Sequence, residues 1–465
     1  SGLIHIGAHS FKAGRAGEAA AYGLAEDLRR HGLRLGRMKT GTPARLKSST
    51  IDYAKLVRQD GDPQPRPFSL FTESVTLPQV CCHIGTTNPR THALVRENLE
   101  RSALYGGQIT GVPARYCPSF EDKIVRFPGR DQHQVILEPE GLETEEVYAS
   151  GLGNSLPLEI QTRLVHSVVG LEEAEIMRPA YAVEYEYVDP LQLFPTLETK
   201  VVRALYLAGQ INGTSGYEEA AGQGFWAGVN AALAVQKRPP FLPDRSQTYL
   251  AVMVDDLVVR GTAEPYRMFT SRAEYRLLLR EDNADERLMG LGHELGLIDR
   301  DTLAQMKERR KRIAMEVRRF KTTSVPCSDE VNAKLAGFGT ASLRNATTLD
   351  QLLKRPEMDY EKTVSLDDSG ERIEQELARH VEIAVKYEGF IERQLREVAE
   401  YRNMEGQRLP GDMDFHAVHG LSSELKEKLA AVRPDSLGRA SRVPGMTPAA
   451  LTALLVHLKR PGGPK

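Results

Sequence analysis

A glycine-rich segment at residues 204–234 constrains the fold of this chain more than any other stretch. Its first five residues, 204–208, are an apolar run that predicts a buried strand. Three glycines follow within residues 209–216 and permit a tight turn, and from Tyr217 small residues recur at helical spacing. A strand, a glycine turn and a helix start together form a site for an anion or a dipole, although an ordinary glycine-rich turn shows the same pattern.

The composition indicates a globular chain without a membrane span. Its 465 residues suggest roughly two to four domains, and no apolar run reaches the ~18 residues that a membrane helix needs. The formal net charge is −2, so nucleic-acid binding must come from local basic patches. The four cysteines are too irregularly spaced for a disulfide framework or a CxxC zinc site, and a reducing cytoplasm fits them.

Two pairs of residues have the chemistry of metal ligands, but neither predicts a metal site. Cys81 and Cys82 are adjacent in the sequence, and adjacent cysteines do not easily share one tetrahedral ion. Asp255 and Asp256 lie in an apolar, helix-like run, which favours a helix-end or salt-bridge role. We therefore expect no metal.

The glycine-rich segment resembles a known family. Residues 205–224 read LYLAGQINGTSGYEEAAGQG and resemble the carboxyl-terminal flavin-binding segment of the tRNA uridine 5-carboxymethylaminomethyl modification enzymes, the MnmG/GidA family. The resemblance implies that Gly209 and Gln210 contact the flavin of FAD, and that the turn from Gly213 to Gly216 lies against it.

A second stretch strengthens the resemblance. Residues 111–123 read GVPARYCPSFEDK and resemble the family's GVGPRYCPSIEDK, with Pro113 in place of glycine and Ala114 in place of proline. If that glycine supplies a positive φ, Pro113 must change the local turn. The resemblance implies that residues 113–127 bind NADH. The cofactor contacts that it implies are Pro113, Ala114, Arg115, Tyr116, Cys117, Pro118, Ser119, Glu121, Asp122, Lys123 and Phe127.

In the family the cysteine of this stretch, here Cys117, is associated with catalysis. The residue types agree, since Arg115 and Lys123 would favour its thiolate. A thiolate can add to an electron-poor pyrimidine carbon, and a thiol can act as a general acid. The alternative is a small buried apolar cysteine. Ser119 is predicted to cap a helix that begins at Phe120.

Candidate RNA contacts are Lys123, Arg267 and Arg276. The arginines belong to an arginine-rich stretch at residues 267–280, whose four- to five-residue spacing would place some of them on one helix face. Ion pairing with Glu264, Glu274, Glu281 or Asp282 is the alternative. Residues 306–321 predict a strongly basic helix, which is either a solvated face or a tRNA contact.

The predicted fold is α/β: a flavin-binding Rossmann-like domain, incomplete at its amino terminus, with an inserted β-rich module and an all-α carboxyl-terminal region. The expected domains are a partial FAD-binding domain at 1–44 and 113–245, an inserted module at 45–112, and a helical tRNA- and partner-binding region at 246–465. No GxGxxG motif follows a strand near residue 1. We therefore expect the chain to be the later part of a longer protein, or to lack the main flavin-anchoring loop and bind FAD weakly.

The resemblance implies an enzyme that uses FAD and NADH to modify tRNA. With the GTPase MnmE, such an enzyme installs a (carboxymethyl)aminomethyl group at carbon 5 of the wobble uridine. It takes one carbon from methylenetetrahydrofolate and an amine from glycine or ammonium, and works as a cytoplasmic homodimer. The alternatives are the related folate- and FAD-dependent tRNA uridine methyltransferase and a non-catalytic tRNA- or partner-binding fragment.

Overall fold

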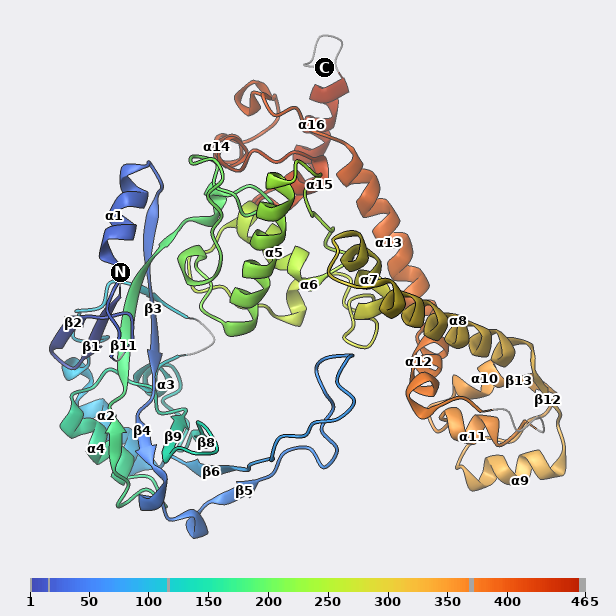
Figure 1. Cartoon of the computed structure of the whole chain (residues 1–465), viewed down its shortest axis with the longest axis horizontal. Coiled ribbons are helices and arrows are strands. Elements are labelled where there is room, and N and C mark those ends of the chain that lie inside the picture. Colours follow the sequence, from blue (N-terminus) through green and yellow to red (C-terminus); the bar gives the residue numbers. More distant parts are fainter. Residues whose placement is uncertain (1, 16, 115–117, 368–371, 460–465) are drawn as a thin grey trace. The chain divides into compact units, whose positions relative to one another are not determined.

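The computed structural model describes residues 2–15, 17–114, 118–367 and 372–459 (Figure 1). The chain forms two compact units. One comprises Ser1–Arg238 with Gly261–Arg267, and the other Pro239–Arg260 with Met268–Lys465. The first unit is mixed α/β and the second is mainly helical, which confirms the predicted fold class.

The first unit contains a five-stranded sheet whose centre is a long strand pair. Strands β3 and β11 run antiparallel through eight residue pairs, from Tyr181 opposite Thr42 to Val188 opposite Leu35. On the other side of β3, a short strand pairs in parallel, with Val112 opposite Met38. The strand order is β2 (His9–Lys12), β1 (Leu3–Ile6), β11 (Tyr181–Val188), β3 (Leu35–Thr42) and β7 (Val112–Pro113), and helix α1 (Tyr22–Arg30) connects β2 to β3.

A six-stranded sheet forms the other layer of this unit. The expected inserted module at 45–112 supplies three of its strands, and the other three come from residues beyond 112. Alternate strand residues such as Leu46, Val135 and Val147 form a core with three helices. The strand order is β10 (Ile176–Arg178), β4 (Arg45–Lys47), β9 (Glu146–Ser150), β8 (Gln134–Pro139), β6 (Cys82–Thr86) and β5 (Val57–Gln59), and the helices are α2 (Pro89–Glu97), α3 (Phe120–Arg126) and α4 (Leu158–His166).

One sequence prediction in the first unit is wrong. Residues 204–208 do not form a strand of the sheet: they fold back on the preceding chain, where the Leu207 amide donates to the Leu197 carbonyl and the Thr199 amide to the Leu205 carbonyl. This local pairing supplies hydrogen-bond partners for backbone groups of the segment without a strand of the sheet. Within the inserted module, the proline-rich residues 60–81 form a long irregular connection between β5 and β6 (Figure 1).

The second unit packs helices around an apolar core that includes Phe320, Leu335 and Leu352. The predicted basic helix at 306–321 is confirmed and lies within α8. The arginine-rich stretch at 267–280 is not helical apart from a 3-10 turn at Thr270–Arg272, so its arginines share no helix face. The elements are α6 (Tyr249–Asp255) with a π-helical turn at Asp256–Arg260, α7 (Ala284–Glu294), α8 (Arg300–Thr322), β12 (Ser324–Val325), α9 (Asp329–Gly337), β13 (Thr347–Thr348), α10 (Leu349–Leu353), α11 (Tyr360–Val364), α12 (Gln375–Lys386), α13 (Glu388–Gly406), α14 (Ser423–Val432), α15 (Leu437–Ser441) and α16 (Pro448–Lys459).

Within the described ranges, no helix is long and apolar enough to cross a membrane.

A buried charge cluster ties together distant parts of the second unit. Arg245, 2% exposed, donates to Asp255, Asp256 and Glu274 at 3.2, 2.9 and 2.8 Å. Arg442 makes a two-pronged contact with Asp255 at 2.6 and 2.8 Å. The predicted salt-bridge role of the two aspartates is thus confirmed. Burial opposes ionisation of Asp255, but the nearby arginines outweigh it and lower the pKa of this carboxyl below its ordinary value.

We expect Arg442→Ala to lower the free energy of unfolding by about 3 kcal/mol, because Asp255 stays buried and loses the closest of its three arginine partners, Arg245, Arg439 and Arg442. Arg408→Ala is the control, since Arg408 is exposed and pairs with Asp435 at the surface, where a pair contributes about 0–1 kcal/mol. Urea unfolding followed by circular dichroism measures both variants.

The same pair of variants has a pH signature. The depressed pKa of Asp255 contributes stability above its unfolded-state pKa, and this stability is lost as the pH falls through the folded-state pKa. Removing Arg442 raises that folded-state pKa, so the variant should lose stability at a higher pH than the control. Equal urea midpoints and pH profiles for the two variants would contradict the role assigned to the cluster.

Candidate functional site

The glycine turn at residues 209–216 adopts conformations that require its glycines. Gly209 and Gly213 have φ values of +79° and +67°. A Cβ added at Gly213 would lie 2.9 Å from the Thr262 side chain and 3.2 Å from the Tyr187 ring. Conformation and space therefore both exclude a larger residue at position 213.

A buried glutamine of α5 (Tyr217–Val235), which the sequence analysis missed, holds this turn. The Oε1 atom of Gln223 accepts hydrogen bonds from the Gly209 amide at 2.9 Å and from Asn212 Nδ2 at 3.1 Å, and its Nε2 donates to Thr214 Oγ1 at 2.7 Å. These three hydrogen bonds fix the backbone of the turn. The sequence signal that could have identified it is a glutamine about two helical turns after a glycine loop.

The side chain of Gln210 remains available to a ligand near the start of α5. The helix begins after Gly216, which has no capping side chain, and the Glu219 carboxylate lies against Gly216. Gln210 is exposed. The first turn also carries Glu219, which pairs with Arg267 at 3.2 Å. Arg267, a predicted RNA contact, thus has an ion-pair partner, though not one of the four that the sequence suggested.

Strand β3 brings the glycine turn close to the beginning of the second predicted segment. On one face, the Cβ position of Gly213 lies 3.3 Å from Met38 Cε. At the edge, Val112 and Pro113 of β7 pair with Met38 and Lys39. Proline is tolerated there because β7 is an edge strand. Arg115, Tyr116 and Cys117, including the predicted catalytic cysteine, lie outside the described residues.

Helix α3 carries the rest of that segment. Its predicted cap is confirmed, since Ser119 Oγ accepts from the Asp122 amide at 3.3 Å. Two of the predicted cofactor contacts are bonded to the protein itself: Glu121 accepts from the Ser155 amide at 2.7 Å, and Asp122 from the Tyr105 hydroxyl at 3.1 Å. Burial, together with Asp122, raises the pKa of Tyr105 to about 12. These two carboxylates therefore hold α3 against the neighbouring chain through Ser155 and Tyr105.

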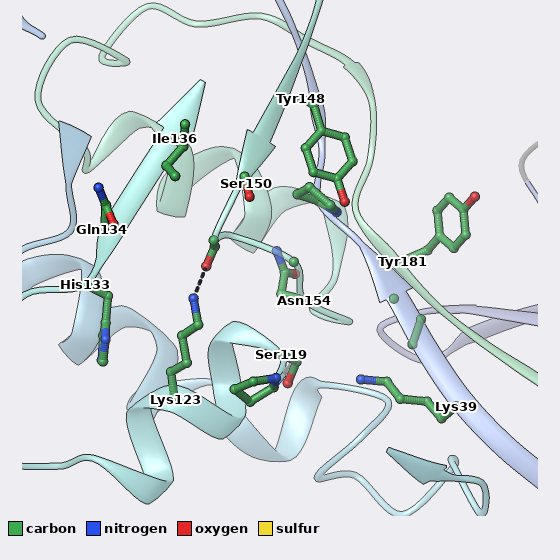
Figure 2. Close-up of a pocket in the computed structure, with 16 residues that line it drawn as sticks. Lys39, Ser119, Lys123, His133, Gln134, Ile136, Tyr148, Ser150, Asn154 and Tyr181 are labelled. Carbon is green, nitrogen blue, oxygen red and sulfur yellow. Dashed lines mark hydrogen bonds between the residues drawn. The ribbon is translucent and has the colours of Figure 1, made fainter. Parts of the chain in front are cut away.

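A cavity of about 360 Å³ opens beside the start of α3 (Figure 2). Lys123 reaches across part of it and donates to the Gly151 carbonyl at 3.2 Å. Burial, with a contribution from His92, lowers the pKa of His133, so this ring is neutral at pH 7. The lining consists of Lys39, Gly41, Pro43, Pro118, Ser119, Lys123, His133, Gln134, Ile136, Tyr148, Ser150, Gly151, Gly153, Asn154, Tyr181 and Ala182.

The cavity combines positive charge, hydroxyl groups and aromatic rings. Lys39 and Lys123 supply ammonium groups, and Tyr148 and Tyr181 supply rings (Figure 2). Such a lining suits a planar ligand that carries an anionic group. Of the predicted site residues, Pro118, Ser119 and Lys123 line this cavity. Lys39 was missed, and the sequence offers only a lysine two residues before Gly41 as its signal.

The remaining predicted residues lie elsewhere. Phe127 is half exposed at the end of α3. Arg276 belongs to the second unit, is exposed, and makes no ion pair with a described residue. Of the predicted alternative partners of the arginines, Glu274 bonds to Arg245 and Asp282 to Arg280.

Comparisons with known proteins cover nearly the whole chain. The family model described as glucose inhibited division protein A matches residues 1–239. Two models, the C-terminal helical domain and the C-terminal helical bundle of the tRNA modifying enzyme MnmG/GidA, match residues 300–395 and 397–463.

Individual relatives agree with the family models. The tRNA uridine 5-carboxymethylaminomethyl modification enzyme MnmG of Syntrophobacter fumaroxidans is 59% identical over 100% of this chain and 72% of its own length. The enzyme of the same name from Geobacter metallireducens is 54% identical over 99% of this chain and 74% of its own. A crystal structure of Aquifex aeolicus GidA, 42% identical, superposes with a TM-score of 0.87 over 99% of this chain and 73% of that one. This chain therefore belongs to the MnmG/GidA family.

Proposed function

We propose that this protein modifies the wobble uridine of tRNA at carbon 5, installing a (carboxymethyl)aminomethyl group with FAD and NADH as cofactors. The single observation that carries the proposal is the 59% identity, over the full length of the chain, to a relative named as a tRNA uridine 5-carboxymethylaminomethyl modification enzyme. The helical models that match residues 300–463 favour this function over the methyltransferase alternative, whose carboxyl end is shorter. If the protein binds tRNA but does not modify it, the non-catalytic binding role is correct.

The glycine turn fits the edge of a flavin. Its backbone is held by Gln223, the side chain of Gln210 is exposed, and the N-cap residue of α5, Gly216, has no side chain. In this proposal Gly209, Gln210, Gly213 and the start of α5 at Gly216 hold FAD. When bound, FAD supplies oxidation–reduction chemistry, and NADH, held by residues 113–127, supplies the hydride.

Cys117 is the proposed catalytic residue. Its neighbours in sequence, Arg115 and Lys123, favour the thiolate, which is the nucleophilic form. The thiolate adds to an electron-poor carbon of the uracil ring, and the carbon–sulfur bond breaks again when the modified base is released. The proposed partners are tRNA, the GTPase MnmE, methylenetetrahydrofolate as one-carbon donor, and a second copy of the chain, in the cytoplasm.

We expect Cys117→Ser to abolish tRNA modification while tRNA affinity stays at the wild-type value, because a serine hydroxyl is scarcely ionised at neutral pH. The matched control is Cys327→Ser, which changes an exposed cysteine of the second unit. Mass spectrometry of nucleosides from treated tRNA, with tRNA binding measured on the same samples, reads both effects. A normal modification rate in Cys117→Ser would remove the catalytic role.

We expect Gln223→Leu to weaken FAD binding at least about tenfold, because the Gly209 amide and the Asn212 side chain lose their acceptor and the turn loosens. The control is Gln236→Leu, an exposed glutamine at the other end of the same helix. Fluorescence titration with FAD gives the affinities, and melting curves show whether the fold is kept. An FAD affinity equal to that of the control would place the flavin away from this turn.

We expect Arg276→Ala to weaken tRNA binding and to reduce the salt slope of binding by about one unit, since each lost phosphate contact releases one counterion fewer. Arg267→Ala should have a smaller effect on tRNA and lower the melting temperature instead, because Arg267 pairs with Glu219. Titration of labelled tRNA at several salt concentrations separates the two. Unchanged slopes in both variants would move the RNA contact to other basic surfaces.

A further inference from the structure

The Lys39 side chain is the unusual group in the cavity beside α3. It is only 4% exposed, and it makes no hydrogen bond or ion pair with any residue that the structure describes. A buried ammonium without a partner costs far more than a surface one. Elsewhere in the chain, deeply buried cations such as Arg245 and Arg442 are fully paired.

The acidic residue nearest to Lys39 in the sheet is already engaged. Glu184 lies directly opposite Lys39 in the β3–β11 ladder. Its Oε2 contacts His5 Nε2 at 2.8 Å. Its Oε1 accepts from the amides of Gly111 and Thr110 at 2.6 and 2.9 Å, and lies 3.2 Å from Arg37 Nε. The carboxylate is therefore saturated without Lys39.

The ammonium of Lys39 is directed into the cavity instead. Figure 2 shows its nitrogen extending from β3 toward the space in front of Ser119, on the opposite side from Lys123. Gly41, two residues along the strand, adds no side chain between the ammonium and the cavity, and a Cβ there would lie 3.9 Å from Lys39 Nζ. The backbone at Gly41 thus leaves the Lys39 ammonium accessible from the cavity.

We propose that Lys39 binds the phosphate of a nucleotide in this cavity. The inference rests on the proposed function, which supplies two nucleotide sources, the tRNA substrate and the nicotinamide dinucleotide. A phosphate oxygen forms a charge-assisted hydrogen bond with the buried ammonium. Tyr148 and Tyr181 add aromatic rings to the lining, with Arg45 over one face of Tyr148 at 4.6 Å, and the volume of about 360 Å³ is within the range of small-ligand sites.

The sign of the stability change distinguishes this role from a structural one. Lys39→Met keeps the length of the side chain and removes the charge, so it should leave the melting temperature of the ligand-free protein unchanged or raise it. If Lys39 had a structural role, Lys39→Met would lower the melting temperature. Lys39→Arg retains the charge, and Lys47→Met is the control, because Lys47 lies on β4 and pairs with Glu175 outside the cavity lining.

Ligand affinity provides the second measurement. Titrations with tRNA and with NADH are carried out on the wild type and the three variants. Lys39→Met should weaken one of the two ligands by about tenfold or more, and Lys39→Arg should restore part of the loss. A loss confined to tRNA, with a salt slope lower by about one, assigns the phosphate to RNA, and a loss confined to NADH assigns it to the cofactor.

Direct labelling makes the test independent of the proposed function. Acetylation of lysines, read by mass spectrometry, follows Lys39 in the wild type with sodium phosphate, NADH or tRNA present, against chloride of equal ionic strength. Protection of Lys39 but not of Lys47 supports the phosphate site even if tRNA modification is absent. No protection by any of the three, or a Lys39→Met variant that melts lower and binds normally, would overturn the inference while leaving the modification chemistry untouched.

Discussion

The β3–β11 ladder is the constraint on which the site depends. Successive residues of a strand face opposite sides of the sheet. Met38 therefore packs toward the glycine turn, whereas Lys39 faces the cavity beside α3. Eight consecutive antiparallel pairs fix this register, and a slip by one residue would exchange the two faces. The turn proposed for the flavin and the cavity proposed for the nucleotide are positioned by a single strand.

Buried charge is handled in two different ways in the two units. In the second unit, Arg245 and Arg442 are surrounded by carboxylates, and their ion pairs join α6 to α15 near the end of the chain. Such a cluster specifies which elements come together more than it adds stability. In the first unit, the nearest carboxylate, Glu184, is used up by His5, Arg37 and the amides before β7. The polar groups of that sheet are arranged so that Lys39 is left for a ligand.

The sequence predicted those features whose cause is local. The cap at Ser119, the basic helix within α8 and the salt-bridge role of Asp255 follow from residue type and spacing, and the structure confirms them. The strand at 204–208 was wrong because an apolar run does not show whether a sheet edge is free to receive it. Gln223 and Lys39 were missed for a related reason. The role of a buried polar group depends on residues that are distant in sequence and close only in the fold.

The geometry before β7 bears on one departure from the family pattern, Pro113 in place of glycine. Gly111 cannot be replaced, because a Cβ there would lie 2.8 Å from the Met38 carbonyl oxygen. Glu184 also clamps the Gly111 amide, so the path of the chain is fixed at this residue. Two residues later, Pro113 lies on β7, the edge strand of the sheet, where proline is tolerated. The close contact that requires glycine is therefore at position 111. Proline at position 113 is compatible with the pairing of β7 and β3.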